Sequence, residues 1–297
     1  MSSSDDSHRS PEYNVWTASD GYPLHYRRWR PDGPPRGYVV AVHGIQSHSG
    51  WYDFSSSRLA EAGYDVTFPD RRGSGQNGRD RGHVVHWERW LNDLSQFLGF
   101  VSFERDRTTS DAPVVLMGIS WGGKLATAAA ACRPDLVDAL ALLYPGLFAQ
   151  VKPTFLQSCL LRLARKLGAN RKSVPVPLDD PEMFTNETGW QQFIRDDPLA
   201  LHHVTTGFLF ANADVQQVAI REAPQIACPI LLMLAGRDRI VDNDATQQFF
   251  DALPNPSKTR VDFPNARHTL EFEPDREDFV RRLIDWLDEL EQTPRTN

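Results

Sequence analysis

The sequence predicts an α/β protein built on a mostly parallel, doubly wound sheet. Two features of the 297-residue chain carry this prediction. Short apolar runs recur along the chain, and stretches with helical periodicity separate them. The runs are continuously apolar rather than alternating, which is typical of strands covered on both faces, as in parallel sheets. Strands and helices that alternate in this way are joined by right-handed crossovers, so helices are expected on both faces of the sheet.

The predicted strands begin with a hairpin. Its two arms, residues 13–18 and 24–29, flank the sequence SDGYP, in which Asp-Gly and Pro favour a turn. Six apolar runs follow, each ending in Gly, Asp, Ser, Pro or His, at residues 37–44, 64–70, 112–120, 136–145, 228–238 and 259–268. We expect these six runs to form the parallel part of the sheet.

Helical periodicity fills the intervals between the predicted strands. It is found at residues 53–64, 85–105, 124–134, 242–253 and 275–292. In the last stretch, five apolar side chains fall on one face, namely Phe279, Leu283, Trp286, Leu287 and Leu290. The chain is therefore expected to close with an amphipathic helix.

One interval breaks the alternation of strands and helices. From residue 146 to residue 221 no parallel-sheet strand is predicted, and a connecting loop rarely needs this length. We therefore divide the chain into a disordered tail (residues 1–12), an α/β core (13–145 and 222–297) and a helical insertion (146–221). The insertion is either a structural excursion or a cap over a site.

The composition is that of an ordinary globular protein and excludes several classes. A net charge of -7 argues against a nucleic-acid-binding surface. Three scattered cysteines are too few for a disulfide framework or a zinc site, which favours a reducing, cytoplasmic location. The polar N-terminus does not resemble a signal peptide, and no apolar run reaches the roughly 18 residues needed to span a membrane.

The stretch VVLMGISWGGKLATAAAA, residues 114–131, places a serine between glycines where a strand becomes a helix. Gly-x-Ser-x-Gly in that context is typical of a nucleophile elbow, whose strained turn exposes the serine hydroxyl above the sheet. The pattern predicts Ser120 as a nucleophile. It also places the backbone N–H of Trp121 at the positive end of the following helix, where it can stabilise an oxyanion. The alternative is a glycine-rich loop that only turns the chain.

A nucleophilic serine needs a base, and the base needs an orienting acid. In this architecture the acid and then the histidine follow the serine along the chain. His268 lies beyond the last predicted strand, and Asp238 ends the strand before it. Asp242 and Asp244 stand just before a helical stretch, which favours N-cap or first-turn positions for them. Because parallel strands end at one edge, we expect Ser120, Asp238 and His268 to meet there.

The loop after residues 37–44 is expected to supply a second oxyanion donor, the backbone N–H of Ile45. His43 is expected to brace this loop rather than to transfer protons. His202 and His203 lie in the insertion without evident partners, so no metal site is predicted.

With these residues in place, the chain resembles the α/β-hydrolases, and within them the monoglyceride lipase, lysophospholipase and serine aminopeptidase group. The resemblance is carried by HGIQSHSGWY (43–52), DRRGSGQNGRDRGH (70–83), GISWGG (118–123), AGRDRIVD (235–242) and RHTLEFE (267–273). It implies a helical cap over the site and a triad of Ser120, Asp238 and His268. It also implies hydrolysis of esters of a lipid-like acid, with no metal or organic cofactor.

The chain departs from this group on both sides of the nucleophile. Monoglyceride lipases usually carry a head-group-binding histidine before the serine and a methionine after it, whereas this chain has Ile119 and Trp121. The difference bears on the head group that the site accepts. Ile119 and His48 are predicted to contact the substrate, and Trp121 to form an apolar wall beside the oxyanion donor.

The predicted function is that of a serine hydrolase, which cleaves carboxylic esters through an acyl-enzyme and touches membrane surfaces transiently. A serine aminopeptidase is the first alternative, and it would hold a substrate amine with acidic cap residues such as Asp179, Asp180, Glu182 and Glu187. A haloperoxidase-like or C–C hydrolase activity would use the same triad. A non-catalytic binding module on a hydrolase fold is the alternative from another class.

Overall fold

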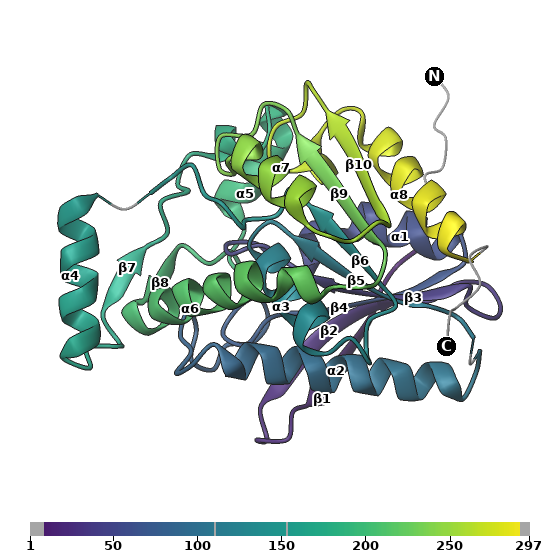
Figure 1. Cartoon of the computed structure of the whole chain (residues 1–297), viewed down its shortest axis with the longest axis horizontal. Helices are drawn as coiled ribbons and strands as arrows, with labels where there is room; N and C mark the ends of the chain where they lie inside the picture. The colour runs from purple at the N-terminus through teal and green to yellow at the C-terminus, as the bar shows by residue number, and fades with distance from the viewer. Residues whose placement is uncertain (1–8, 110, 153, 292–297) are drawn as a thin grey trace.

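The protein is described by a computed structural model that covers residues 9–109, 111–152 and 154–291 (Figure 1). Most of the predicted disordered tail, residues 1–8, lies outside the described residues. Arg9, which the sequence assigns to that tail, is in contact with the core. It donates its backbone N–H to Ser57 Oγ over 2.7 Å, and its guanidinium pairs with Asp32 at 2.5 Å.

One eight-stranded sheet forms the centre of the molecule. Its strands, in spatial order, are β1 (Glu12–Thr17), β2 (Pro23–Trp29), β4 (Tyr64–Pro69), β3 (Gly37–Val42), β5 (Val114–Ile119), β6 (Ala139–Leu143), β9 (Ile230–Ala235) and β10 (Lys258–Phe263). The hairpin β1–β2 is antiparallel, and so is the pairing of β2 with β4. The pairings from β4 to β10 are parallel. The hairpin and the six apolar runs lie where the sequence predicts them, and the predicted α/β class is confirmed.

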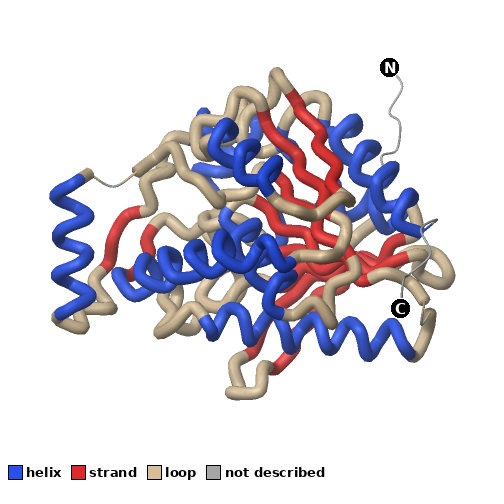
Figure 2. The backbone as a smooth tube through the Cα atoms, viewed as in Figure 1, coloured by secondary structure: helices blue, strands red, loops and turns tan. Residues whose placement is uncertain are grey.

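The central strands are apolar along their whole length because helices cover the sheet on its two sides (Figure 2). Every residue of β3, β5, β6 and β9 is buried. The core helices are α1 (Asp53–Glu61), α2 (Glu88–Asp106), α3 (Trp121–Cys132), α7 (Asn243–Ala252) and α8 (Arg276–Glu291). Helix α1 contacts α8, whereas α2 contacts α3. Burial on both faces removes the alternating pattern of a half-exposed strand, as expected.

The insertion between β6 and β9 has one part that extends away from the core and one part that packs against the core. Its elements are α4 (Phe155–Lys166), β7 (Ser173–Pro175), the 3-10 helix η2 (Pro181–Met183), α5 (Thr188–Asp196), β8 (His203–Thr205), α6 (Thr206–Glu222) and the 3-10 helix η3 (Ala223–Gln225). Strands β7 and β8 form a small antiparallel sheet of their own. Helix α4 stands away from the core, and none of its twelve residues is buried (Figure 1). Helix α6 instead packs along α3.

Across the described ranges, no helix is both long enough and apolar enough to cross a membrane.

Candidate active site

Ser120 occupies the sharp turn between β5 and α3. Its backbone has φ 51° and ψ -123°, in a region that L-residues rarely adopt. Glycine is required on both sides of it. A Cβ on Gly118 would lie 2.6 Å from the Cβ of Ala126, and a Cβ on Gly122 would lie 2.1 Å from the carbonyl oxygen of Val42. The start of α3 is thus pressed against the ends of two strands, which places the serine at the tip of the turn.

Backbone hydrogen bonds hold this strained turn in place. The N–H of Ser120 donates to the carbonyl of Leu143 over 3.0 Å. The carbonyl of Ser120 accepts from the N–H of Gly123 at 2.9 Å and from that of Gly146 at 2.6 Å. A strained backbone persists only where its surroundings fix it, and here β6 and the residues after it do so.

The structure brings Ser120, His268 and Asp238 together, as predicted from their order in the chain. His268 Nε2 lies 2.8 Å from Ser120 Oγ, and His268 Nδ1 lies 2.7 Å from Asp238 Oδ2. The other oxygen of Asp238 accepts the backbone N–H groups of Ile240 and Val241, at 2.7 and 3.0 Å. An imidazole that donates Nδ1–H to a carboxylate leaves Nε2 free to accept the serine proton.

The neighbouring carboxylates have other positions. Asp242 is the N-cap of α7, and its Oδ1 accepts the N–H of Ala245 at 3.0 Å. Asp244 lies in the first turn of that helix. The helix-start pattern in the sequence therefore separates these two residues from the acid that contacts His268.

The loop after β3 presents one peptide unit to Ser120. A Cβ on Gly44 would lie 3.4 Å from the Cβ of Ser120, so the backbone here passes directly beside the serine. The carbonyl of Gly44 accepts from His43 Nδ1 at 2.8 Å and from Arg71 Nη1 at 3.1 Å. In a trans peptide the C=O and the following N–H point in opposite directions. The N–H of Ile45 is therefore directed away from Arg71.

His43 braces this loop in the neutral state. Burial and the nearby Arg71 cation hold the pKa of His43 well below its ordinary value. A neutral ring has one donor and one acceptor, and both are used: Nδ1–H donates to Gly44, and Nε2 accepts the backbone N–H of Arg71 at 2.8 Å. The expected bracing role agrees with this geometry.

A narrow, mostly apolar cavity of about 10 Å³ opens beside Ser120. It is lined by Gly44, Ile45, Gln46, Ser47, Trp51, Tyr52, Ser120, Tyr144, Leu178, Phe184, His268 and Thr269. Leu178 and Phe184 come from the insertion, so the insertion supplies part of the wall. None of these lining residues carries a carboxylate.

The two residues predicted to contact the substrate do not line this cavity. Ile119 is buried within β5. His48 accepts the N–H of Gly50 at its Nδ1, and its Nε2 lies 3.0 Å from Asp197 of the insertion. Asp197 also accepts from Trp51 Nε1 at 2.6 Å. His48 therefore ties the loop after β3 to the insertion, and a role in substrate contact remains a prediction for both residues.

Trp121 has a different environment from the one predicted for its side chain. Its indole packs edge-on against Trp90 at 4.9 Å, between centroids, and donates Nε1–H to Asn212 at 2.8 Å. Its ring is absent from the cavity lining. The predicted apolar wall comes instead from Trp51, Leu178 and Phe184.

Sequence reasoning did not find the aromatic groups that enclose His268. Tyr144 lies edge-on to the imidazole, with centroids 4.8 Å apart, and Phe184 lies 5.9 Å from it. Tyr144 follows β6 with φ 36°, a conformation that its sequence context does not signal. Phe184 belongs to the insertion, where no motif indicates which side chains face the core.

Comparison with known proteins identifies the family. The serine aminopeptidase S33 family matches residues 33–275. The chain belongs to that family. A monoglyceride lipase of Rattus norvegicus is 27% identical over 255 residues, which are 85% of this chain and 82% of the relative. The crystal structure of a Paleococcus ferrophilus monoacylglycerol lipase has a TM-score of 0.79 and 25% identity, and covers 90% of this chain and 99% of its own.

The chain also matches part of a longer protein. An abhydrolase domain-containing protein of Dictyostelium discoideum is 29% identical over 91% of this chain, and the match spans only 28% of that relative. The resemblance to α/β-hydrolases drawn from the motifs is confirmed, and the protein is a hydrolase enzyme.

A buried glutamate next to the site gives the stability of this S33 protein a pH dependence. Glu271 lies in the 3-10 helix η4 (Leu270–Phe272), and one of its oxygens accepts the N–H of Ser55 at 2.9 Å. The other oxygen has no partner within the described residues. Burial raises the pKa of Glu271 to about 7, although the Ser55 hydrogen bonds and Arg276 lower it in part. The Glu271 carboxyl group therefore stays protonated up to a higher pH in the folded protein than in the unfolded chain.

We expect the free energy of unfolding to fall as the pH rises from about 4.3 to about 7, because the native state binds the extra proton over this window. Glu271→Gln keeps an acceptor for Ser55 and removes the ionisation. At pH 8 it should be more stable than the parent by on the order of 1–3 kcal/mol, and this gain should shrink at pH 5. Urea unfolding at both pH values measures the difference, with Glu88→Gln, an exposed glutamate, as control. Equal gains at the two pH values would contradict the prediction.

Proposed function

We propose that this protein is a serine hydrolase that cleaves carboxylic esters of an apolar, lipid-like acid through an acyl-enzyme. The proposal is supported above all by the continuous hydrogen bonding from Asp238 through His268 to Ser120, at 2.7 and 2.8 Å. The apolar cavity beside the serine and the lipases among the relatives support an apolar, lipid-like acyl group in the substrate. A non-catalytic binding module would have no need of this arrangement.

The reaction has two acyl-transfer steps. His268 Nε2 takes the hydroxyl proton as Ser120 Oγ attacks the ester carbonyl carbon. The N–H groups of Ile45 and Trp121 hold the oxyanion that forms. When the tetrahedral intermediate collapses, His268 gives the proton to the departing alcohol oxygen. Water then attacks the acyl-enzyme in the same way and releases the acid. Asp238 orients the imidazole and stabilises its charged form.

The aminopeptidase alternative is less well supported. A substrate with a free amine needs a carboxylate in the site, and the residues that line the cavity include none. The four acidic residues considered for this role, Asp179, Asp180, Glu182 and Glu187, are exposed. Asp180 caps η2 and lies 3.7 Å from Arg239.

Substrate preference tests this choice directly. We expect p-nitrophenyl esters of medium-chain acids to be hydrolysed at least about 100-fold faster than aminoacyl p-nitroanilides, in kcat/KM, because the site offers apolar wall and no anion for the amine. Ser120→Ala serves as the blank for both substrate classes. A preference for aminoacyl anilides would reject the ester assignment while leaving the nucleophile in place.

The carboxylate that orients His268 can be identified by comparing Asp238 with Asp242. Asp238→Asn should remain folded, but its turnover should fall by about four orders of magnitude, the size seen for a serine protease, because the imidazole loses its orienting acceptor. Asp242→Asn should stay active, since asparagine caps a helix about as well as aspartate. Steady-state ester hydrolysis and labelling of Ser120 with a fluorophosphonate measure both effects. An active Asp238→Asn enzyme would mean that another carboxylate is the acid.

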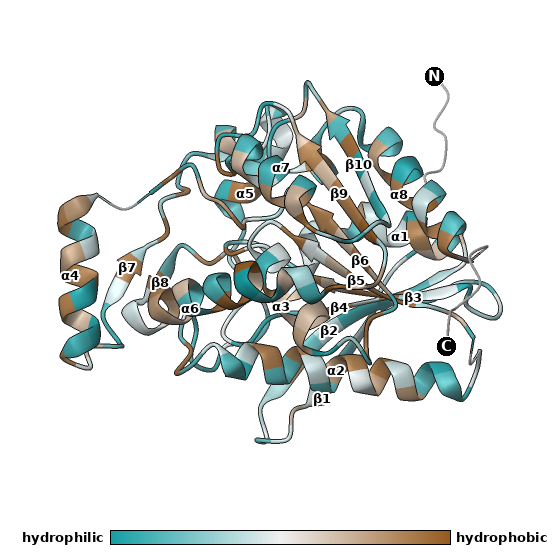
Figure 3. Cartoon of the chain, viewed as in Figure 1, coloured by the Kyte–Doolittle hydropathy of each residue, from teal (hydrophilic) through white to brown (hydrophobic). Residues whose placement is uncertain are grey.

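We further propose that residues 146–221 act as the cap and that α4 touches lipid surfaces. The proposed contact is supported by five exposed apolar side chains on α4 and at its C-cap: Phe155, Leu156, Leu160, Leu163 and the C-cap Leu167, which are 52–84% exposed. Brown and teal alternate along this helix in Figure 3, as in amphipathic helices that lie at membrane interfaces. Arg162 and Lys166 add positive charge on the same helix.

Vesicle binding tests the role of α4. Leu160→Ser combined with Leu163→Ser should reduce co-sedimentation with vesicles of anionic and neutral phospholipid by at least about threefold, because it removes apolar area from the helix. Phe103→Ser, an equally exposed apolar residue on α2, is the matched control and should bind as the parent does. Equal binding by all three proteins would exclude α4 as the contact.

A further inference from the structure

Arg71 is a buried cation directly behind the loop that passes Ser120. Its side chain follows β4 and is only 6% exposed. Its guanidinium donates to two consecutive carbonyls of that loop, from Nη1 to Gly44 at 3.1 Å and from Nη2 to Ile45 at 3.2 Å. The guanidinium carbon also lies 4.3 Å from the centre of a Trp121 ring. One side chain therefore contacts both residues whose N–H groups are the proposed oxyanion donors.

Arg71 has no carboxylate in direct contact, although the field of the preceding Asp70 carboxylate favours its charged form. Within the described residues no acidic side chain forms an ion pair with it, and its Nε has no hydrogen-bond acceptor. Burial lowers the pKa of Arg71 to about 9, which still leaves the group charged at neutral pH. The adjacent Arg72 is the opposite case, because it pairs with Asp93 at 2.6 Å and with Asp20 at 3.0 Å.

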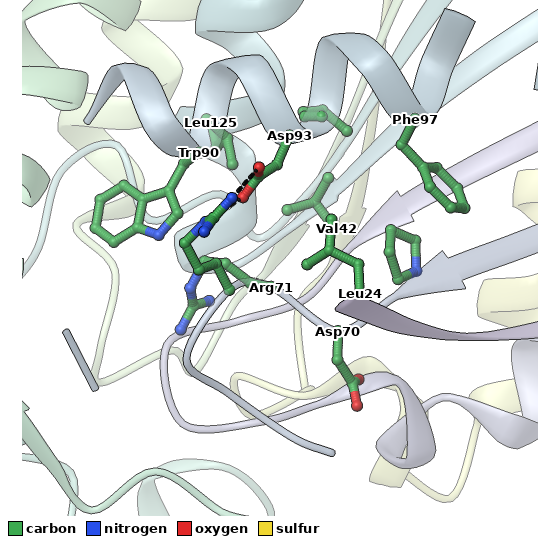
Figure 4. A pocket seen from close by; sticks show the side chains of 11 residues that line it. Leu24, Val42, Asp70, Arg71, Trp90, Asp93, Phe97 and Leu125 are labelled. Carbon is green, nitrogen blue, oxygen red and sulfur yellow. Dashed lines mark hydrogen bonds and ion pairs between the residues drawn. The ribbon is translucent and has the colours of Figure 1, made fainter. Parts of the chain in front are cut away.

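Figure 4 shows this difference. Arg71 lies in the wall of a small cavity with Trp90 and Leu125, while dashed lines mark the ion pair that Asp93 makes with the neighbouring arginine. An unpaired buried cation is costly for a folded protein, so packing alone is a poor reason for its presence. The cost is explained if the cation acts on a negative charge that develops on the other side of the loop during the reaction.

We propose that Arg71 is a positioning residue of the oxyanion hole, which fixes the Gly44–Ile45 peptide and adds its positive charge behind it. By holding the carbonyl of Gly44, it fixes the N–H of Ile45 in the opposite direction, within a loop that passes beside Ser120. This inference rests on the proposed function of Ser120 as the nucleophile of an ester hydrolase.

The proposal has a specific kinetic consequence. The ester carbonyl is neutral in the bound substrate and becomes an oxyanion only as the serine adds. Groups that act on the oxyanion therefore raise kcat and tighten tetrahedral analogues, and they leave KM nearly unchanged. A residue that merely supports the fold would not separate these quantities.

The experiment compares Arg71→Gln and Arg71→Lys with Arg72→Gln, a matched change at the paired neighbouring arginine. Each protein is assayed with a p-nitrophenyl ester and with an alkyl trifluoromethyl ketone of the same chain length, which adds to serine as a tetrahedral oxyanion. For Arg71→Gln we expect kcat to fall by about 10–100-fold, somewhat less than loss of a direct donor, with the inhibition constant rising in proportion and KM changing less than about threefold. Arg72→Gln should keep kcat and the inhibition constant, even where its urea midpoint falls.

If Arg71→Gln does not fold, Arg71→Lys tests whether Arg71 acts on the oxyanion. Lysine keeps the charge, but its single nitrogen does not reproduce the paired hydrogen bonds of the guanidinium, so an intermediate loss of kcat and of ketone affinity is expected. Unchanged ketone affinity in a folded Arg71 variant, or failure of both variants to fold, would overturn the proposal and leave Arg71 a structural role. If the parent protein neither hydrolyses the ester nor binds the ketone, the proposed function fails instead.

Discussion

The close approach of α3 to the sheet is the constraint on which the site depends. A Cβ at Gly122 would lie 2.1 Å from the carbonyl oxygen of Val42, so the first turn of α3 touches the end of β3. This contact forces the chain to reverse at Ser120 with a positive φ. It also places the N–H of Trp121 next to the loop that leaves β3. A single contact between a helix and a strand end thus sets the nucleophile and brings the two proposed oxyanion donors together.

The remaining groups reach Ser120 because parallel strands end at one edge of the sheet. Ser120 and His268 are 148 positions apart, yet they share a hydrogen bond, since β5, β6, β9 and β10 are consecutive neighbours in the sheet. The strand ends fix the backbone, and local hydrogen bonds fix the side chains: Asp238 is held by the N–H groups of Ile240 and Val241. Its carboxylate is therefore oriented before His268 uses it.

Local patterns predicted those parts of the fold and the site whose cause is local. The glycines around Ser120 signal the turn that they permit, and Asp238 is separated from Asp242 by the helix start that Asp242 caps. Side-chain contacts outside the triad that depend on long-range packing were not predicted. Tyr144 contacts His268 because the sheet brings their segments together. His48 was predicted to contact the substrate, but its two ring nitrogens interact with Gly50 and Asp197. No short stretch of sequence encodes such partners.

Trp121, which follows the nucleophile, contacts Arg71 rather than the cavity. Its indole faces inward, where it stacks with the guanidinium at 4.3 Å rather than lining the cavity. The cation is thus stabilised by the π face of Trp121 and by the carbonyl dipoles of Gly44 and Ile45, none of which carries a formal negative charge. A carboxylate in contact with Arg71 would cancel its field at the proposed oxyanion more fully than Asp70, which acts on it without an ion pair. Stabilisation by dipoles and an aromatic face keeps the cation buried without a contacting anion, so in the proposed mechanism Arg71 and Trp121 act as one electrostatic unit behind the oxyanion.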